Sequence, residues 1–195
     1  MNKNLTEIVF LIDRSGSMGG LEKDTIGGYN AFLEKQKQVE GSIIVTTVLF
    51  DDKYELLWNG LDAEKVKLTN KEYFVRGSTA LLDAVGKTIL DVGFRLSNVL
   101  EHQRPSKVIF VIITDGMENA SREFTYNKVQ ELILHQQSKY DWEFIFLGAN
   151  IDAAKEAGNI GISEDNAIHF EATEDGIEMV YSTVCEAVSE IRLRK

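Results

Sequence analysis

The sequence predicts an α/β protein with a doubly wound, mostly parallel six-stranded sheet, one antiparallel edge strand and helices on both faces. Two observations support this prediction. Short, continuous apolar runs rich in β-branched and aromatic residues are typical of strands that are buried on both faces. The segments between these runs repeat their apolar residues every three or four positions, which is the period of a helix. Alternating strands and helices form doubly wound sheets with right-handed crossovers.

Four of the strands are expected at the apolar runs 8–12, 43–50, 108–113 and 144–147. The acidic turn that begins at Asp51 leads from the second run into residues 54–60, which we interpret as the other arm of a hairpin. A hairpin places one antiparallel strand at an edge of the sheet. The sixth strand is expected over residues 166–170.

Long helices are expected over residues 19–39, 80–102, 126–138 and 174–193. A short helix is expected between Asp152 and Gly158, and Thr125 and Thr173 are placed to cap the helices that follow them. Two adjacent glycines, Gly27-Gly28, each weaken the first helix by about 1 kcal/mol relative to alanine. We expect these glycines to let that helix lie close to the sheet.

The chain has 195 residues, of which 44% are apolar and 27% are charged, and no linker-like segment divides it. We therefore predict a single domain over residues 1–195. The one cysteine, Cys185, cannot form an internal disulfide and has no zinc-site spacing around it, so we expect it in the core. This cysteine usage favours a reducing, cytoplasmic setting.

The charge balance argues against two classes of partner. Thirty-one acidic and 21 basic side chains give a formal net charge of −10. Phosphate backbones and anionic membranes repel such a surface, so we expect no nucleic-acid or membrane partner. The apolar runs are also too short for a signal-peptide core or a membrane-spanning helix.

Oxygen-bearing side chains follow two predicted strands and precede one predicted helix: Asp13, Ser15 and Ser17 after the first strand, Asp115 after the fourth, and Thr79 before the helix. In doubly wound sheets, ligands bind at the carboxyl ends of the strands. Carboxylates and hydroxyls suit Mg²⁺, Mn²⁺ or Ca²⁺ and not zinc or copper. An extended turn would direct alternate side chains toward the ion, with Arg14 pointing elsewhere and Gly16 permitting the bend.

These residues resemble the metal-ion-dependent adhesion site of the von Willebrand factor A (vWA) domain, which is Asp-x-Ser-x-Ser with a distant Thr and a distant Asp. The resemblance extends from about residue 5 to 193 and covers all five positions: Asp13, Ser15, Ser17, Thr79 and Asp115. It implies a Rossmann-like fold and Mg²⁺ held by the three hydroxyls, with the aspartates acting directly or through water. It also implies a partner protein whose Asp or Glu side chain completes the coordination, and no enzymatic activity.

Two other functions remain open at this stage. A Mg²⁺-dependent phosphoryl-transfer hydrolase of the haloacid-dehalogenase type also places an aspartate after its first strand, although it requires a second acid where Ser15 stands. Release of phosphate from a generic ester would identify it. A metal-free structural adaptor with the same fold would bind its partner equally well in Mg²⁺ and in EDTA.

Several polar residues near these motifs have simpler interpretations. We expect Asp83 to hold nearby backbone, Asp51 to serve its turn and Asp152 to cap a helix. Glu118 and Asn119 are expected in a solvated loop, with partner contact or the sixth metal position as the alternative.

Overall fold

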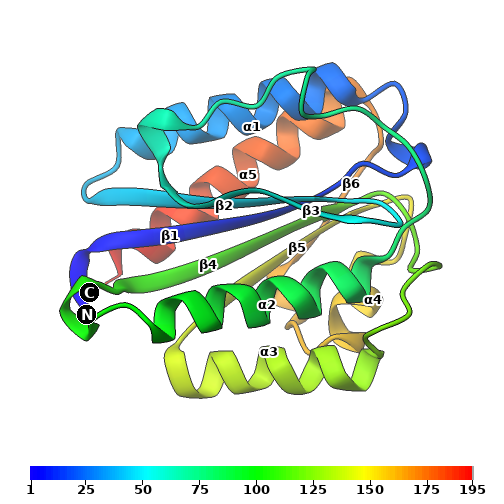
Figure 1. Ribbon diagram of the computed structural model, residues 1–195. Helices are drawn as coiled ribbons and strands as arrows, with labels where there is room; N and C mark the ends of the chain where they lie inside the picture. The colour runs from blue at the N-terminus through cyan, green and yellow to red at the C-terminus, as the bar shows by residue number, and fades with distance from the viewer. Residues whose placement is uncertain (195) are drawn as a thin grey trace.

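Helices cover both faces of a central sheet in the computed structural model, which describes residues 1–194 (Figure 1). Lys195, the last residue of the predicted domain, lies outside the described residues. The strands are β1 (Asn2–Asp13), β2 (Ser42–Phe50), β3 (Tyr54–Asp62), β4 (Pro105–Thr114), β5 (Glu143–Ala149) and β6 (Ala167–Phe170). The α-helices are α1 (Glu22–Lys37), α2 (Leu81–Ser97), α3 (Tyr126–Tyr140), α4 (Ala153–Asn159) and α5 (Glu174–Leu193).

The strand order across the sheet is β3-β2-β1-β4-β5-β6. Only the β2–β3 pair is antiparallel among the described strands, and it lies at the edge, as the hairpin predicted. The chain runs outward from β1 through β2 to β3, then crosses back to place β4 on the other side of β1. The strand order therefore reverses between β1 and β4, which is the point where such sheets bind ligands.

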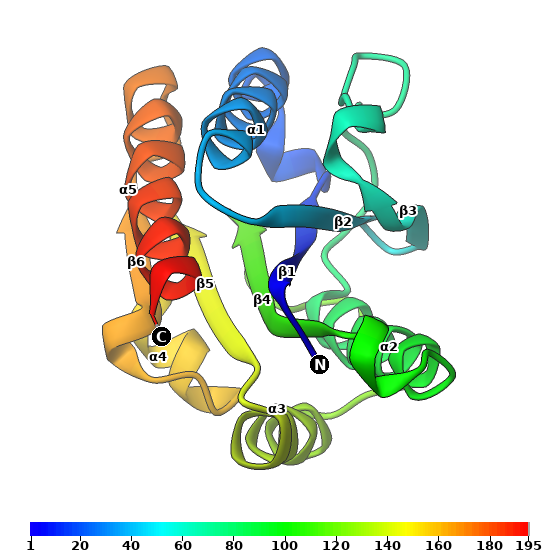
Figure 2. The ribbon, with the colours of Figure 1, turned by 90° about the vertical axis from the view of Figure 1, so that its left-hand side faces the viewer.

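The strands β1, β2, β4 and β5 are buried on both faces over most of their length, which explains the continuous apolar runs. Helices α1 and α5 cover one face, and α2, α3 and α4 cover the other (Figures 1 and 2). On the first face, the Phe10 ring makes edge contacts with Tyr29 and Phe32 of α1. On the second face, the Phe110 ring stacks on Trp142. Neighbouring strand residues thus enter two separate cores, and β1 is buried on both faces from Thr6 to Asp13.

The predicted helix caps are confirmed. The side chains of Thr125, Asp152 and Thr173 accept hydrogen bonds from backbone N–H groups three residues ahead. Helix α2 ends at Ser97, five residues earlier than expected. The Ser97 hydroxyl and the Asn98 amide both donate to the Phe94 carbonyl, and such local bonds compete with the helical ladder.

The glycines of α1 were expected to let this helix lie close to the sheet, and that expectation is wrong. A Cβ atom on Gly28 would lie 2.2 Å from Cδ2 of Tyr181, so the glycine lets α1 approach α5 and not the sheet. A Cβ atom on Gly27 would meet no atom within 4 Å. The expected core position of Cys185 on α5 is confirmed. Within residues 1–194, every helix is too short or too polar to cross a bilayer.

Candidate metal centre

Side chains from three distant segments meet where β1 and β4 end. The Ser17 hydroxyl donates to Oδ1 of Asp115 at 2.6 Å, and Oγ of Ser15 lies 3.0 Å from Oγ of Ser17. Thr79 belongs to the same group, because a Cβ atom on Gly116 would lie 2.8 Å from Oγ1 of Thr79 and 3.3 Å from Oγ of Ser17. The structure therefore brings the predicted oxygen donors together at the reversal of strand order.

Asp13 is fully buried, and both of its carboxylate oxygens accept hydrogen bonds. Oδ1 accepts from the backbone N–H of Ser15, and Oδ2 accepts from the Thr114 hydroxyl, each at 2.6 Å. Thr114 was not among the predicted site residues, although it stands directly before Asp115 at the end of β4. These bonds fix the Asp13 carboxylate between β1 and β4.

The loop after β1 differs from the extended turn that was expected. Ser15 is extended, but Gly16–Met18 form a 3₁₀ turn, which curls the chain so that Ser17 faces Ser15 and Asp115. Arg14 does point elsewhere, as expected, and is fully buried. Curvature of the chain, and not strict alternation, therefore brings the two hydroxyls together.

Thr79 is held in place by the loop that follows β4. The backbone N–H of Thr79 donates to the Asn119 side chain, and the backbone N–H of Asn119 donates to the Thr79 carbonyl, both at 3.0 Å. The Glu118 carboxylate accepts from the backbone of Leu82 and Ser121. Glu118 and Asn119 lie in a loop as expected, with Asn119 exposed and Glu118 half-buried, and their side chains also fasten this loop to the start of α2.

Asp83 holds backbone as expected, through the N–H groups of Arg122, Glu123 and Phe124. Its carboxylate lies at the first turn of α2 and anchors the far end of the loop whose near end carries Asn119. The loop after β4 is thus tied to the start of α2 through Glu118, through Asn119 and through residues 122–124.

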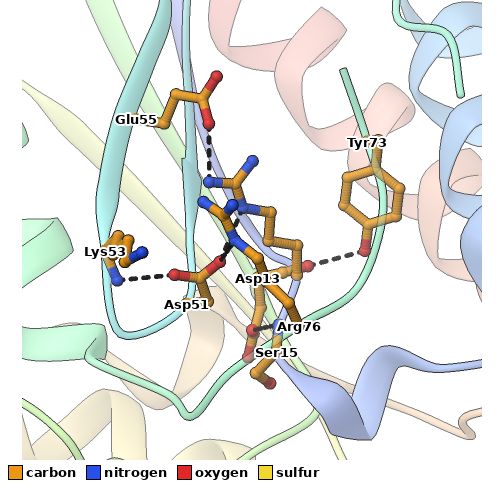
Figure 3. A network of polar contacts seen from close by, with 8 residues as sticks. Asp13, Ser15, Asp51, Lys53, Glu55, Tyr73 and Arg76 are labelled. Carbon is orange, nitrogen blue, oxygen red and sulfur yellow. Dashed lines mark hydrogen bonds and ion pairs between the residues drawn. The ribbon is translucent and has the colours of Figure 1, made fainter. Parts of the chain in front are cut away.

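Asp51 does more than shape its turn (Figure 3). Oδ1 accepts from the backbone N–H of Lys53, as turn chemistry requires, but Oδ2 accepts from Nε of Arg14 at 3.0 Å and Nε of Arg76 at 2.6 Å. Burial alone would raise the pKa of Asp51, but the hydrogen bond from Arg76 leads the contacts that instead hold this pKa below its usual range. The fully buried carboxylate therefore links the loop after β1 to the loop before α2.

The two aspartates of the cluster are costly to ionise without a cation. Burial raises the pKa of Asp13 to about 6, and burial also raises the pKa of Asp115. Oδ2 of Asp115 is buried, and no group within residues 1–194 donates a hydrogen bond to it. An unpaired buried carboxylate oxygen is unfavourable unless a positive charge or a donor faces it.

The cluster fits a hard divalent cation. Mg²⁺ takes six oxygens at about 2.0–2.1 Å, so neighbouring ligands of its octahedron lie about 3.0 Å apart. The hydroxyl oxygens of Ser15 and Ser17 have that separation, 3.0 Å. Oδ2 of Asp115 supplies an anionic oxygen with no other partner. In the described part of the chain, no three His, Cys, Asp or Glu side chains form a metal cluster, so the hydroxyls are needed to complete a donor set here.

No protein-family model and no curated protein matches the sequence. Solved structures do match the fold. The vWF domain of the type V pili tip protein Mfa5 from Porphyromonas gingivalis aligns with a TM-score of 0.68 at 12% identity, over 97% of each chain. The ArnB paralog VWA2 from Sulfolobus acidocaldarius aligns with a TM-score of 0.56 at 16% identity, over 95% of this chain and 45% of VWA2.

A third similar structure is proximal thread matrix protein 1 from the mussel byssus, described as having a zinc-occupied MIDAS motif, where MIDAS denotes the metal-ion-dependent adhesion site. It aligns with a TM-score of 0.65 at 15% identity, over 96% of this chain. This chain spans about half of that protein, 47%. One fold accounts for all of these observations: the strand order, the antiparallel edge strand, the helices on both faces and the alignments. The chain has the fold of a von Willebrand factor A domain.

Proposed function

We propose that this protein is a divalent-cation-dependent protein-binding module, that Mg²⁺ is its cation, and that an acidic side chain of a partner protein completes the coordination. The observation that carries the proposal is the buried, unpartnered Oδ2 of Asp115 beside the hydroxyls of Ser15 and Ser17. The metal site described for the similar byssus protein supports the choice of a divalent cation.

Each residue of the cluster has a defined part in this proposal. Ser15, Ser17 and Thr79 would hold the cation through hydroxyl oxygens, and Asp115 would balance its charge. Asp13 would hold the loop of the site in position, because its carboxylate oxygens already accept hydrogen bonds from Ser15 and Thr114. A bound cation supplies a positive centre with water-filled positions, and Mg²⁺ retains such waters readily. A carboxylate from another protein can replace one of them.

The proposal describes a binding module and not an enzyme, and it places the protein in the cytoplasm, where a reduced, buried Cys185 is stable. The similar proteins include a pilus tip protein and a byssus matrix protein, which supports the non-enzymatic binding role but not the cytoplasmic location. Partner capture in Mg²⁺ and its loss in EDTA would separate this function from that of a metal-free adaptor.

The direct test is Mn²⁺ binding measured by electron paramagnetic resonance, with Mg²⁺ as competitor. Thr79→Val removes one hydroxyl at nearly constant volume and should weaken Mn²⁺ binding at least tenfold. Thr183→Val makes the same change on the exposed side of α5 and should leave Mn²⁺ binding unchanged. Wild-type protein that binds no Mn²⁺, or a Thr79→Val variant that binds as tightly as Thr183→Val, would contradict the proposal.

A further inference from the structure

Arg76 lies in the segment that leads to Thr79 and is held in place by three contacts. Its backbone N–H donates to the Arg14 carbonyl at 2.8 Å, and its Nε donates to the buried Asp51 carboxylate at 2.6 Å. Its guanidinium carbon lies 5.4 Å from the centre of the Phe74 ring. Figure 3 shows the Arg76 side chain directed at the Asp51 carboxylate.

The segment that carries Arg76 runs along the loop after β1. The residue that follows Arg76, Gly77, accepts a hydrogen bond at its carbonyl from the Gly16 backbone at 3.1 Å. Two residues further on, Thr79 reaches the cluster. Arg76 is thus part of the same rim as the proposed cation and is not on a distant surface.

The terminal nitrogens of Arg76 are free to bind a ligand. The side chain is 38% exposed, and within residues 1–194 its only ion-pair contact runs through Nε to Asp51. That carboxylate is shared with Nε of Arg14, whose own terminal Nη2 lies 2.7 Å from Glu55. Arg76 therefore presents the two N–H₂ groups that grip a carboxylate in bidentate fashion.

The arrangement is pre-organised, and this matters for affinity. An arginine that must be ordered on binding loses side-chain entropy, whereas an arginine already fixed by an ion pair and an aromatic ring loses less. The protein also carries a formal net charge of −10, which repels acidic partners at long range. Arg76 adds a fixed positive charge at this rim, and the nearby carboxylates of Asp51, Glu55 and Asp52 raise the pKa of its guanidinium.

From this geometry we infer that the partner presents two acidic groups, one for the cation and a second for Arg76, so that Arg76 selects a diacidic segment over a single acid. The inference rests on the proposed function, because the first acid binds at the cation. Phe74, which is 45% exposed, supports the guanidinium and lies within the same contact area.

The test uses synthetic peptides of equal length with a neutral background and either one glutamate or two glutamates at increasing separations. Affinity for the wild-type protein is measured in Mg²⁺ and in EDTA. At the best separation, the second glutamate should strengthen Mg²⁺-dependent binding about tenfold. Arg76→Gln should remove that gain and leave the affinity for the one-glutamate peptide unchanged. Arg122→Gln makes the same change of charge on another exposed loop and should retain the gain.

Mn²⁺ binding to each variant shows whether the cation site stays intact, and Arg76→Gln should bind Mn²⁺ like the wild type. If both peptides bind equally in Mg²⁺, the second subsite does not exist, although the proposed function stands. If neither peptide shows Mg²⁺-dependent binding, the proposed function fails and the inference fails with it. If Arg76→Gln loses Mn²⁺ affinity, Arg76 acts on the cation site and the inference is wrong.

Discussion

At the scale of single residues, the site depends on one position that carries no side chain. Gly116 directly follows Asp115, and its α-carbon faces the hydroxyls of Thr79 and Ser17. The backbone angle at Gly116 is not one that excludes other residues. Space, and not backbone conformation, therefore requires glycine here, because a methyl group would occupy the volume between the donors.

We predict that Gly116→Ala weakens Mn²⁺ binding at least tenfold. The new Cβ atom would lie 2.8 Å from Oγ1 of Thr79, closer than such atoms pack, so that hydroxyl must move. Gly158→Ala is the control, because a Cβ atom there would meet nothing within 4 Å. Isothermal titration with Mn²⁺ measures both variants, and equal affinities would show that Thr79 is not a ligand.

The buried Asp51 leads to a prediction about stability. Asp51→Asn removes the charge that faces Arg14 and Arg76, and breaking a buried ion pair in this way costs about 3 kcal/mol. The exposed neighbour offers a control, and Asp52→Asn should change the free energy of unfolding by less than about 0.5 kcal/mol. Urea unfolding at neutral pH measures both variants, and equal stabilities would contradict the prediction.

The difference in stability between the wild type and Asp51→Asn should depend on pH. The pKa of Asp51 is lower in the folded state than in the unfolded chain, where a typical aspartate has a pKa of about 3.9. Its contribution to stability is therefore complete above that unfolded value and is lost as the pH falls through the lowered folded value. The stability difference between wild type and Asp51→Asn should shrink on acidification, and a constant difference down to low pH would refute this.

At the scale of elements, α1 and α5 pack closely because α1 has no side chain where Tyr181 lies against it. The groove between these helices is lined by both glycines, by Phe32 and by Tyr181, and it has a volume of about 400 Å³. The Tyr181 ring occupies the space beside the α-carbon of Gly28, whereas the space beside Gly27 is open. The two neighbouring glycines should therefore respond oppositely to the same substitution.

We predict that Gly28→Ala destabilises the protein by about 1–3 kcal/mol, because its Cβ atom would overlap the Tyr181 ring. Gly27→Ala should stabilise it by about 0.5–1 kcal/mol, because alanine is the better helix former and nothing obstructs it. Thermal unfolding of the two variants in parallel measures both signs. Two changes of the same sign would contradict the packing of α1 on α5.

Elements with a strong local signal could be predicted from the sequence, and contacts between distant residues could not. The strands, the hairpin and the caps at Thr125, Asp152 and Thr173 follow from short-range patterns, and the structure has all of them. The donor positions of the cluster could be anticipated because each one directly follows a strand or precedes a helix.

What the sequence did not reveal depends on pairing across long separations. Asp51 is 37 residues from Arg14 and 25 from Arg76, and nothing in its local sequence distinguishes a turn aspartate from a buried ion-pair partner. The bond between Asn119 and Thr79 spans 40 residues. Gly28 showed that the helix approaches something closely, but the partner, Tyr181, is known only from the fold.

At the scale of the whole molecule, cation binding should appear as thermal stability. A ligand that binds only the folded state adds about 2.7 kcal/mol at one hundred times its dissociation constant. In a chain of 195 residues, this corresponds to a rise in Tm of roughly 5–11 °C. Mg²⁺ should raise the Tm of the wild type by this amount, and KCl of equal ionic strength should not. A rise of equal size in Thr79→Val would show that the Mg²⁺ acts elsewhere.

Both ends of the described chain meet the start of β4. The backbone N–H of Asn2 donates to the Arg104 carbonyl, and Nζ of Lys107 donates to the Arg194 carbonyl. The donor cluster lies at the opposite end of the same strands (Figure 1). A pull between a tether at the N-terminal end and a load at the cluster would therefore run along β1. The ladders that join β1 to β2 and β4 would be sheared as a set and not peeled rung by rung, which is the mechanically resistant direction of a sheet.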